Sequence, residues 1–186
     1  MTSAYVGLGS NLGDRRRYLG EALARLSRCA GIQVADVSRL YESDPVGVLD
    51  QPRFLNAAAW IPSSLTPRQL LSALLDVERQ MGRIRTQKWG PRNIDLDLLL
   101  FGTAVIRQKG LTLPHPHLAK RPFVLAPLCD LGESLVHPCL NRTVGQLYRE
   151  LCGETPLRPA GRLDWKSGEL LPRSSSPQAE DNPPQV

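Results

Sequence analysis

The sequence lacks the features that would place it in a membrane or outside the cell. It has no apolar stretch approaching the roughly 20 residues that a transmembrane helix needs. Its first residues, MTSAYVGLGS, lack the basic segment and long apolar run of a secretory signal peptide. Cysteine is scarce, because the 186 residues include four and none of them form a CxxC pair. These absences predict a cytoplasmic protein with reduced thiols and no membrane partner.

Several common catalytic motifs are also missing. The stretch GLGSNLGD at residues 7–14 breaks the GxGxxG spacing and lacks the Lys-Ser/Thr ending of a phosphate-binding P-loop. A tight turn between a strand and a helix explains it better. The stretch PHPHL holds His115 and His117 without nearby cysteines, which argues against zinc. These histidines are expected in a rigid turn, or alternatively as hydrogen-bond donors to a ligand. No arrangement of serine or cysteine suggests covalent catalysis.

The positive charge is concentrated in one segment. The formal net charge is +5, and after residue 156 the four basic and four acidic residues cancel. The densest basic stretch, between residues 79 and 92, contains no acid; its members are Arg79, Arg83, Arg85, Lys88 and Arg92. A polyanion is the expected partner. The planar guanidinium groups of Arg83, Arg85 and Arg92 suit phosphate oxygens. Trp89 is either a core residue or a stacking surface for a flat ring.

Two carboxylates follow this basic stretch, inside a segment that has the pattern of a strand. In GPRNIDLDLLLF, Asp95 and Asp97 alternate with apolar residues before an unbroken apolar run. Because side chains alternate along a strand, both acids face the same side of the sheet. A buried charge must be paired or bound to a metal. We favour Mg²⁺, which binds carboxylates together with substrate phosphates, over ion pairs with nearby arginines.

The order of predicted elements indicates a ferredoxin-like α+β fold. Strands are expected at residues 4–8, 32–41, 54–61 and 94–101, although the alanines of 54–61 also allow a helix. One helix follows the first strand around residues 19–26, and a second follows the third strand over residues 67–81, with Thr66 and Gln69 in a capping box. The result is βαββαβ, an antiparallel sheet covered by helices. Further helices are expected at 123–129 and 143–151. The domain is predicted to span residues 1–157, and residues 158–186, rich in Pro, Ser and mixed charge, to form a flexible tail.

Four segments together resemble one enzyme family, the 6-hydroxymethyl-7,8-dihydropterin pyrophosphokinases of folate synthesis. They are GLGSNLGD, YESDPVGVLDQPRFLNAA, GRIRTQKWGPRNIDLDLLLFG and LPHPHLAKRPFVLAPL. The resemblance implies a ferredoxin-like fold and the transfer of diphosphate from ATP to the hydroxymethyl oxygen of the pterin, with release of AMP. It implies Asp95 and Asp97 as ligands of two Mg²⁺ ions, and Arg83 and Arg92 as catalytic groups that hold phosphate charge.

The resemblance also assigns the residues that line the substrate pocket. For ATP these are Glu78, Arg83, Arg85, Trp89, Arg92, Leu98, Leu111, Thr112, His115 and Arg121. For the pterin they are Ser43, Asp44, Val46, Phe54, Asn56, Trp89 and Phe123. The ring of the pterin is expected between Phe54 and Phe123, with Asn56 reading its polar edge. The loops at 42–53 and 82–92 are expected to close over the reactants.

The partners expected from these arguments are small molecules, ATP and the hydroxymethyldihydropterin. Ferredoxin-like sheets can also bind RNA, but such modules carry aromatic residues in a K/R-G-F/Y pattern on a central strand. The corresponding strand here reads IDLDLLLF, whose acids would repel phosphate unless a metal intervened. No nucleic acid and no obligate protein partner are therefore expected.

Overall fold

The computed structural model describes residues 1–83, 90–153 and 156–163. Its centre is an antiparallel sheet in which the strands run in the order β10-β3-β4-β1-β5, with β10 formed by Pro159–Arg162. The main strands are β1 (Thr2–Ser10), β3 (Arg39–Ser43), β4 (Phe54–Ser63) and β5 (Asp95–Phe101). The predicted strands at the start of the chain, at 54–61 and at 94–101 are thus confirmed, and the helical alternative for 54–61 is wrong.

Two helical crossovers produce the ferredoxin-like topology. Helix α1 (Arg15–Leu26) joins β1 to β3, two parallel strands separated by β4. Helix α2 (Pro67–Gln80) joins β4 to β5 in the same way, with β1 between them. The βαββαβ order and the fold class predicted from the sequence are confirmed.

The second strand differs from its prediction. Instead of one strand over residues 32–41, the chain forms β2 (Asp36–Val37) and β3, and their register against β4 shifts by one residue at Ser38. The Ser38 hydroxyl causes this break, because it accepts the Ala58 N–H at 2.9 Å and donates to the Arg39 carbonyl at 2.7 Å. A side chain therefore replaces part of the strand ladder, as in a β-bulge.

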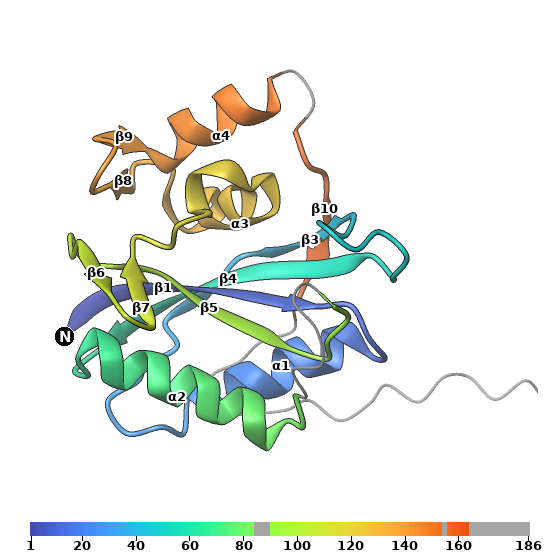
Figure 1. Ribbon diagram of the computed structural model, residues 1–186, viewed down its shortest axis with the longest axis horizontal. Coiled ribbons are helices and arrows are strands. Elements are labelled where there is room, and N and C mark those ends of the chain that lie inside the picture. The colour runs from blue at the N-terminus through green and yellow to red at the C-terminus, as the bar shows by residue number, and fades with distance from the viewer. Residues whose placement is uncertain (84–89, 154–155, 164–186) are drawn as a thin grey trace, which may run out of the picture.

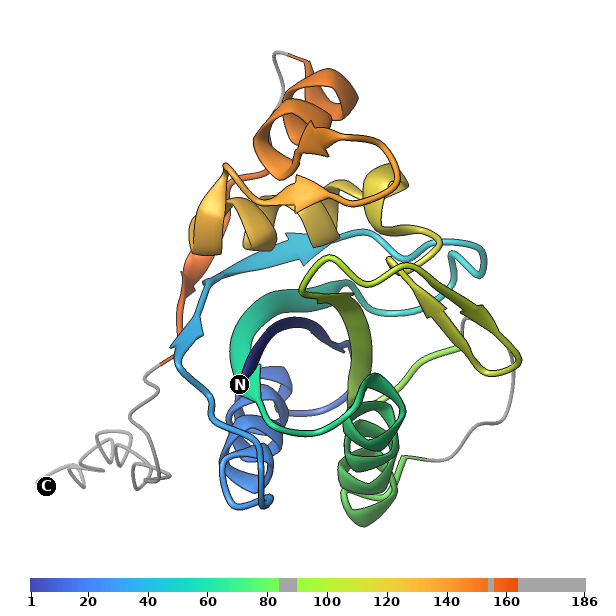
Figure 2. The same ribbon diagram turned by 90° about the vertical axis from the view of Figure 1, so that its left-hand side faces the viewer.

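Helices cover both faces of the sheet (Figures 1 and 2). Helices α1 and α2 pack on one face over a core of aliphatic residues, and α2 begins with the predicted Thr66–Gln69 capping box. On the other face, α3 (Pro122–Gly132) and α4 (Val144–Cys152) bury Leu99 and Leu100 of β5. In the described part of the chain, each helix is too short or too polar to span a membrane.

Short elements complete the fold. A hairpin of β6 (Ile106–Gln108) and β7 (Leu111–Leu113) follows β5, and the turn η1 (Leu118–Lys120) precedes α3. A second hairpin, β8 (Val136–His137) with β9 (Arg142–Thr143), leads into α4. These strands have two or three residues each, too few for a periodic pattern in the sequence to show them.

The boundary between the domain and the predicted tail requires a correction. Residues Pro159–Arg162 form β10, which pairs with β3 at the edge of the sheet. The Arg16 guanidinium of α1 holds this strand by donating to the carbonyls of Ala160 at 2.6 Å and Arg162 at 3.0 Å. The prediction of a tail from residue 158 is therefore wrong for these four residues, because contacts distant in sequence order them. Residues 164–186 lie outside the described residues.

Candidate active site

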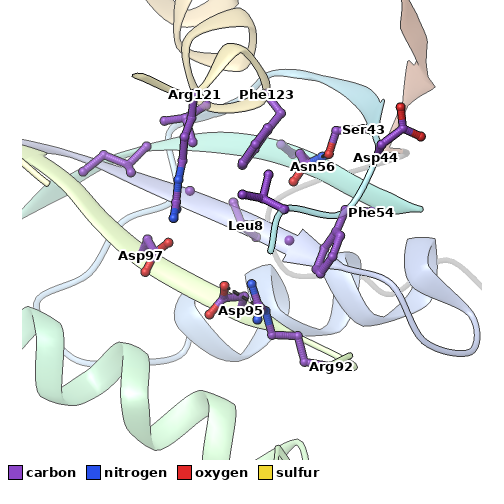
Figure 3. Close-up of a pocket in the computed structure, with 16 residues that line it drawn as sticks. Leu8, Ser43, Asp44, Phe54, Asn56, Arg92, Asp95, Asp97, Arg121 and Phe123 are labelled. Carbon is purple, nitrogen blue, oxygen red and sulfur yellow. Dashed lines mark hydrogen bonds and ion pairs between the residues drawn. The ribbon is translucent and has the colours of Figure 1, made fainter. Parts of the chain in front are cut away.

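A pocket lies on the α3 side of the sheet, where β1, β4 and β5 meet the loop after β3 and the start of α3 (Figure 3). Its lining consists of Gly7, Leu8, Gly9, Ser43, Asp44, Val46, Phe54, Asn56, Ala57, Arg92, Asp95, Asp97, Leu99, Arg121, Phe123 and Val124. Segments that are far apart in the sequence thus form one cavity.

Glycines of β1 form part of the floor of the pocket. A Cβ atom on Gly7 would lie 3.3 Å from Leu99 Cδ1, and one on Gly9 would lie 3.6 Å from Asn56 Oδ1. A side chain at either position would crowd these neighbours or fill the cavity. This role of the two glycines was not predicted from the sequence. The signal was glycine at alternate positions, with Gly7 in the predicted strand and Gly9 just after its end, which marks a face that another group approaches closely.

Asp95 and Asp97 project from the same face of β5, as the strand period predicts. Asp95 is held by two arginines, with Arg83 Nη1 at 2.5 Å from Oδ1 and Arg92 Nε at 3.0 Å from Oδ2. Arg83 also forms an ion pair with Glu78. The salt-bridged alternative considered for the acid pair is therefore what the structure shows for Asp95.

Glu78 supports this cluster from the end of α2. The residue is 2% exposed, and its Oε1 accepts the backbone N–H of Leu96 at 2.7 Å. Because the Leu96 N–H lies between the two aspartates in the chain, this bond ties α2 to the acid-bearing strand. The same Oε1 pairs with Arg83, which in turn reaches Asp95.

The surroundings of Asp97 are different. Among the described residues, the basic side chain that reaches its carboxylate is His115, with Nε2 at 4.0 Å from Oδ1. Burial and the neighbouring Asp95 raise the pKa of Asp97 to about 7, against the opposing effect of Arg121. Burial and Arg121 lower the pKa of His115 to about 4, so its ring is neutral at pH 7. His115 Nδ1 accepts the His117 N–H at 3.3 Å, which leaves the proton on Nε2, facing Asp97.

The other half of the pocket is aromatic and amide-lined. Phe54 and Phe123 both line it, and a guanidinium group lies over each ring. Arg92 is 5.0 Å from the centroid of Phe54, and Arg121 is 5.8 Å from that of Phe123. Asn56 is 6% exposed, and its Nδ2 donates to the Tyr41 carbonyl at 3.2 Å and to Ser43 Oγ at 3.0 Å. A flat ring with polar edges suits this environment.

Comparison with known proteins identifies the family. The model of the 7,8-dihydro-6-hydroxymethylpterin-pyrophosphokinase family matches residues 5–133. The chain belongs to this family. A relative from Bacillus subtilis, named 2-amino-4-hydroxy-6-hydroxymethyldihydropteridine pyrophosphokinase, is 48% identical over 132 residues, which cover 71% of this chain and 79% of the relative. A Pseudomonas aeruginosa protein of the same name is 46% identical over 159 residues, or 86% and 95% of the two chains.

A solved structure supports the fold. The crystal structure of Plasmodium falciparum HPPK-DHPS superposes with a TM-score of 0.67 at 16% identity, covering 81% of this chain. This chain spans 45% of that longer chain. At this level of identity, the likeness concerns the fold of the pyrophosphokinase family alone.

The structure gathers most of the residues expected for this pyrophosphokinase family, but not all of them. All of the expected pterin residues that are described line the pocket, together with Arg92, Asp95, Asp97 and Arg121. Leu98 and Leu111 instead place their side chains in the core beneath the sheet, and Thr112 is exposed on β7. Arg85 and Trp89 lie outside the described residues.

The donor set of the pocket suits magnesium. In the described part of the chain, no group of three or more His, Cys, Asp and Glu side chains is arranged to hold a metal by itself. Two carboxylates on one face are nevertheless the hard oxygen ligands that Mg²⁺ prefers, because it completes its shell with water and substrate phosphates. A cation there would also relieve the repulsion that raises the pKa of Asp97.

Proposed function

We propose that this protein transfers the diphosphate group of ATP to the hydroxymethyl oxygen of 6-hydroxymethyl-7,8-dihydropterin, giving the pterin diphosphate and AMP, in folate biosynthesis. One observation carries the proposal beside the family membership. A single pocket joins an aromatic, amide-lined half to a half with two carboxylates and several arginines. The first half suits a flat heterocycle, and the second suits a polyphosphate with its metal.

The pterin is proposed to bind in the aromatic half. Phe54 and Phe123 would contact the two faces of the ring, and Asn56 would bond its polar edge. The amide of Asn56 is already oriented by its bonds to Tyr41 and Ser43, so little freedom is lost on binding. Ser43, Asp44 and Val46 would close the side of the pocket.

The phosphates of ATP are proposed to bind beside Asp95 and Asp97. Arg92 and Arg121 line the pocket there, and Arg83 lies directly behind Asp95. Their guanidinium groups would hold the transferred group in line and stabilise the charge that develops during transfer. Glu78 orients Arg83, and neutral His115 can donate from Nε2. We assign Arg85 and Trp89 to the same site from the sequence alone.

The adenosine is proposed to lie toward the β6–β7 hairpin. Because the side chains of Leu98 and Leu111 point into the core, their proposed contribution comes from backbone atoms. Thr112 is exposed and can contribute through its side chain.

Asp95 and Asp97 are proposed to hold two Mg²⁺ ions. When bound, Mg²⁺ neutralises phosphate charge and polarises the oxygens of the reacting group. The chain itself would orient both substrates in one pocket and keep their reacting atoms close, which converts a bimolecular step into a nearly unimolecular one. Walls formed by Leu99, Phe54 and Phe123 would limit the access of water, which would otherwise compete for the transferred group.

We also propose that the protein works in the cytoplasm without an obligate protein partner. All four cysteines are free thiols, as a reducing compartment requires.

Product analysis tests the proposed function. The protein is mixed with Mg²⁺, ATP and 6-hydroxymethyl-7,8-dihydropterin, and the nucleotides and pterins are separated. We expect AMP and pterin diphosphate in equal amounts, and no AMP when the pterin is omitted. The formation of ADP would instead show transfer of a single phosphate and contradict the proposal. Pterin binding without turnover would indicate a binding protein that has lost catalysis.

A further inference from the structure

Asn11 lies next to the pocket without lining it, and its side chain joins two walls. It follows the last residue of β1, in the turn before α1, and is 2% exposed. Both ends of its amide group form hydrogen bonds to segments that are distant in the sequence. No role is given to it by the proposed function.

The acceptor end of Asn11 holds the segment before β5. Its Oδ1 accepts the backbone N–H of Arg92 at 2.8 Å, while its own backbone N–H donates to the Arg92 carbonyl at 3.1 Å. Two bonds thus grip the backbone of Arg92, whose side chain reaches Asp95 at 3.0 Å. This end of the amide therefore positions an arginine on the phosphate side of the pocket.

The donor end holds the loop between β3 and β4. Nδ2 donates to Gln51 Oε1 at 3.0 Å and to the Pro52 carbonyl at 3.0 Å. Pro52 lies two residues before Phe54, and Gln51 Nε2 continues the connection to the Val48 carbonyl at 2.7 Å. This end therefore positions an aromatic residue on the pterin side.

The two walls meet over the pocket, where the Arg92 guanidinium lies 5.0 Å from the centroid of the Phe54 ring. An amide is the group that can accept from one wall and donate to the other at this length, since a carboxylate cannot donate and an aliphatic side chain can do neither. We propose that Asn11 is a positioning residue that sets the spacing between the phosphate-binding and pterin-binding halves of the pocket. This inference rests on the proposed function.

Two substitutions separate the two ends of the amide. Asn11→Asp keeps an acceptor for the Arg92 N–H but loses the donors to Gln51 and Pro52. Asn11→Ala loses both. Ser63→Ala is a matched control, because Ser63 is 1% exposed and also joins two loops, donating to Gly31 at 2.7 Å and accepting from Leu65 at 3.1 Å, away from the pocket.

Three quantities are measured at pH 8: the Kd of the protein for the Mg²⁺ complex of α,β-methylene ATP, the Kd of the analogue-saturated protein for the pterin, and kcat. The analogue is used because it cannot release its diphosphate. For Asn11→Asp we expect the pterin Kd to rise about tenfold, with the analogue Kd changed less than about twofold. For Asn11→Ala we expect a similar rise in pterin Kd. In addition, kcat should fall about tenfold, because the backbone of Arg92 also loses its hydrogen bond to the side chain. Ser63→Ala should lower the melting temperature and leave all three constants within about twofold.

The wild-type protein is measured first, so that the two proposals are judged separately. Absence of pterin binding and turnover in the wild type would overturn the proposed function, and this inference with it. If the wild type is active, wild-type constants in Asn11→Asp and Asn11→Ala would overturn the inference alone. The inference would also be overturned if the two Kd values and kcat changed in proportion to the melting temperature, and to the same degree, in the Asn11 and Ser63 variants. Such a result would show that Asn11 has a purely structural role. If Asn11→Ala does not fold, the Asn11→Asp comparison decides.

Discussion

Asp95 and Asp97 are two residues apart on one face of β5, yet their electrostatic surroundings differ. Asp95 contacts two guanidinium groups, whereas the half-buried Asp97 lies beside another carboxylate and a neutral histidine. These surroundings raise the pKa of Asp97 to about 7 from an ordinary value of 3.8. The charge of Asp95 is thus balanced by neighbouring guanidinium groups, whereas the charge of Asp97 is balanced less. An added cation therefore stabilises the ionised form of Asp97 most.

Asp97→Asn is expected to separate activity from stability. Turnover should fall by about 10³-fold, because a proposed ligand of the metal is lost. Since the folded pKa of Asp97 is raised, its ionisation destabilises the metal-free fold increasingly between pH 4 and pH 7 and fully above that. In EDTA at pH 8 the variant should therefore unfold at the same or a higher urea concentration than the wild type. The gain in its free energy of unfolding should be on the order of 1 kcal/mol at most after solvent screening.

Asp36→Asn, a change on the exposed edge of β2, is the control for this prediction and should alter neither property. Near-normal turnover of Asp97→Asn in saturating Mg²⁺ would remove Asp97 from the metal site. Unfolding of Asp97→Asn in the absence of metal would show that the carboxylate has a structural role instead.

At the scale of elements, one carboxylate attaches α3 to the sheet. Asp130, near the end of α3, accepts a hydrogen bond from the backbone N–H of Arg39 at 2.9 Å and forms an ion pair with the Arg39 guanidinium. It also accepts a hydrogen bond from the Tyr41 hydroxyl at 3.0 Å. Burial raises the pKa of Asp130, but the hydrogen bonds from Arg39 and Tyr41 outweigh burial and lower it overall. Because α3 carries Arg121 and Phe123 at its other end, this attachment also fixes one wall of the pocket.

Asp130→Asn is expected to lower the free energy of unfolding by about 2 kcal/mol at pH 7. A carboxyl whose pKa is lowered by folding stabilises the fold at pH values above its pKa in the unfolded chain, which is 3.8. This stabilisation is lost as the pH falls through the pKa that the carboxyl has in the folded protein. The difference between wild type and variant in urea unfolding should therefore shrink below about pH 4.

Glu133→Gln is the matched control, because Glu133 follows α3 directly and pairs at 3.4 Å with Arg149 through exposed side chains. Its effect should be less than about 0.5 kcal/mol. An equal effect of the two substitutions, or a pH-independent effect of Asp130→Asn, would contradict the role given to the Asp130 cluster.

At the scale of the whole molecule, the chain returns to its own sheet after α4. Strand β10 adds to the edge of β3, and Ala160 and Leu163 pack against the core beneath the sheet. Arg16 anchors this strand through two backbone carbonyls. The edge of β3 is thus covered by a segment whose composition resembles a linker.

Truncation should reveal where the domain ends. A chain that stops at Leu163 is expected to match the full-length protein in melting temperature and in kcat. A chain that stops at Leu157 loses β10 and should be less stable by about 2 kcal/mol, from the lost burial of Ala160 and Leu163 and the lost strand pairing. Differential scanning calorimetry with steady-state kinetics measures both. Equal stability of the two shortened chains would show that β10 contributes nothing.

The sequence by itself determined whatever depends on local periodicity and capping. The alternation in IDLDLLLF placed Asp95 and Asp97 on one face, and Thr66 with Gln69 marked the start of α2, because a strand repeats every two residues and a helix start leaves N–H groups to satisfy. The order of these elements was enough for the ferredoxin-like fold.

Only the tertiary structure decided which distant residues meet. The two bonding ends of Asn11, the break at Ser38 and the docking of β10 by Arg16 depend on partners far along the chain. A side chain that bonds across segments leaves no periodic trace in its own neighbourhood, since its partner is chosen by the packing of the sheet and helices. The pairing of Asp95 with two arginines, and the higher pKa of Asp97 beside it, were likewise set by three-dimensional proximity.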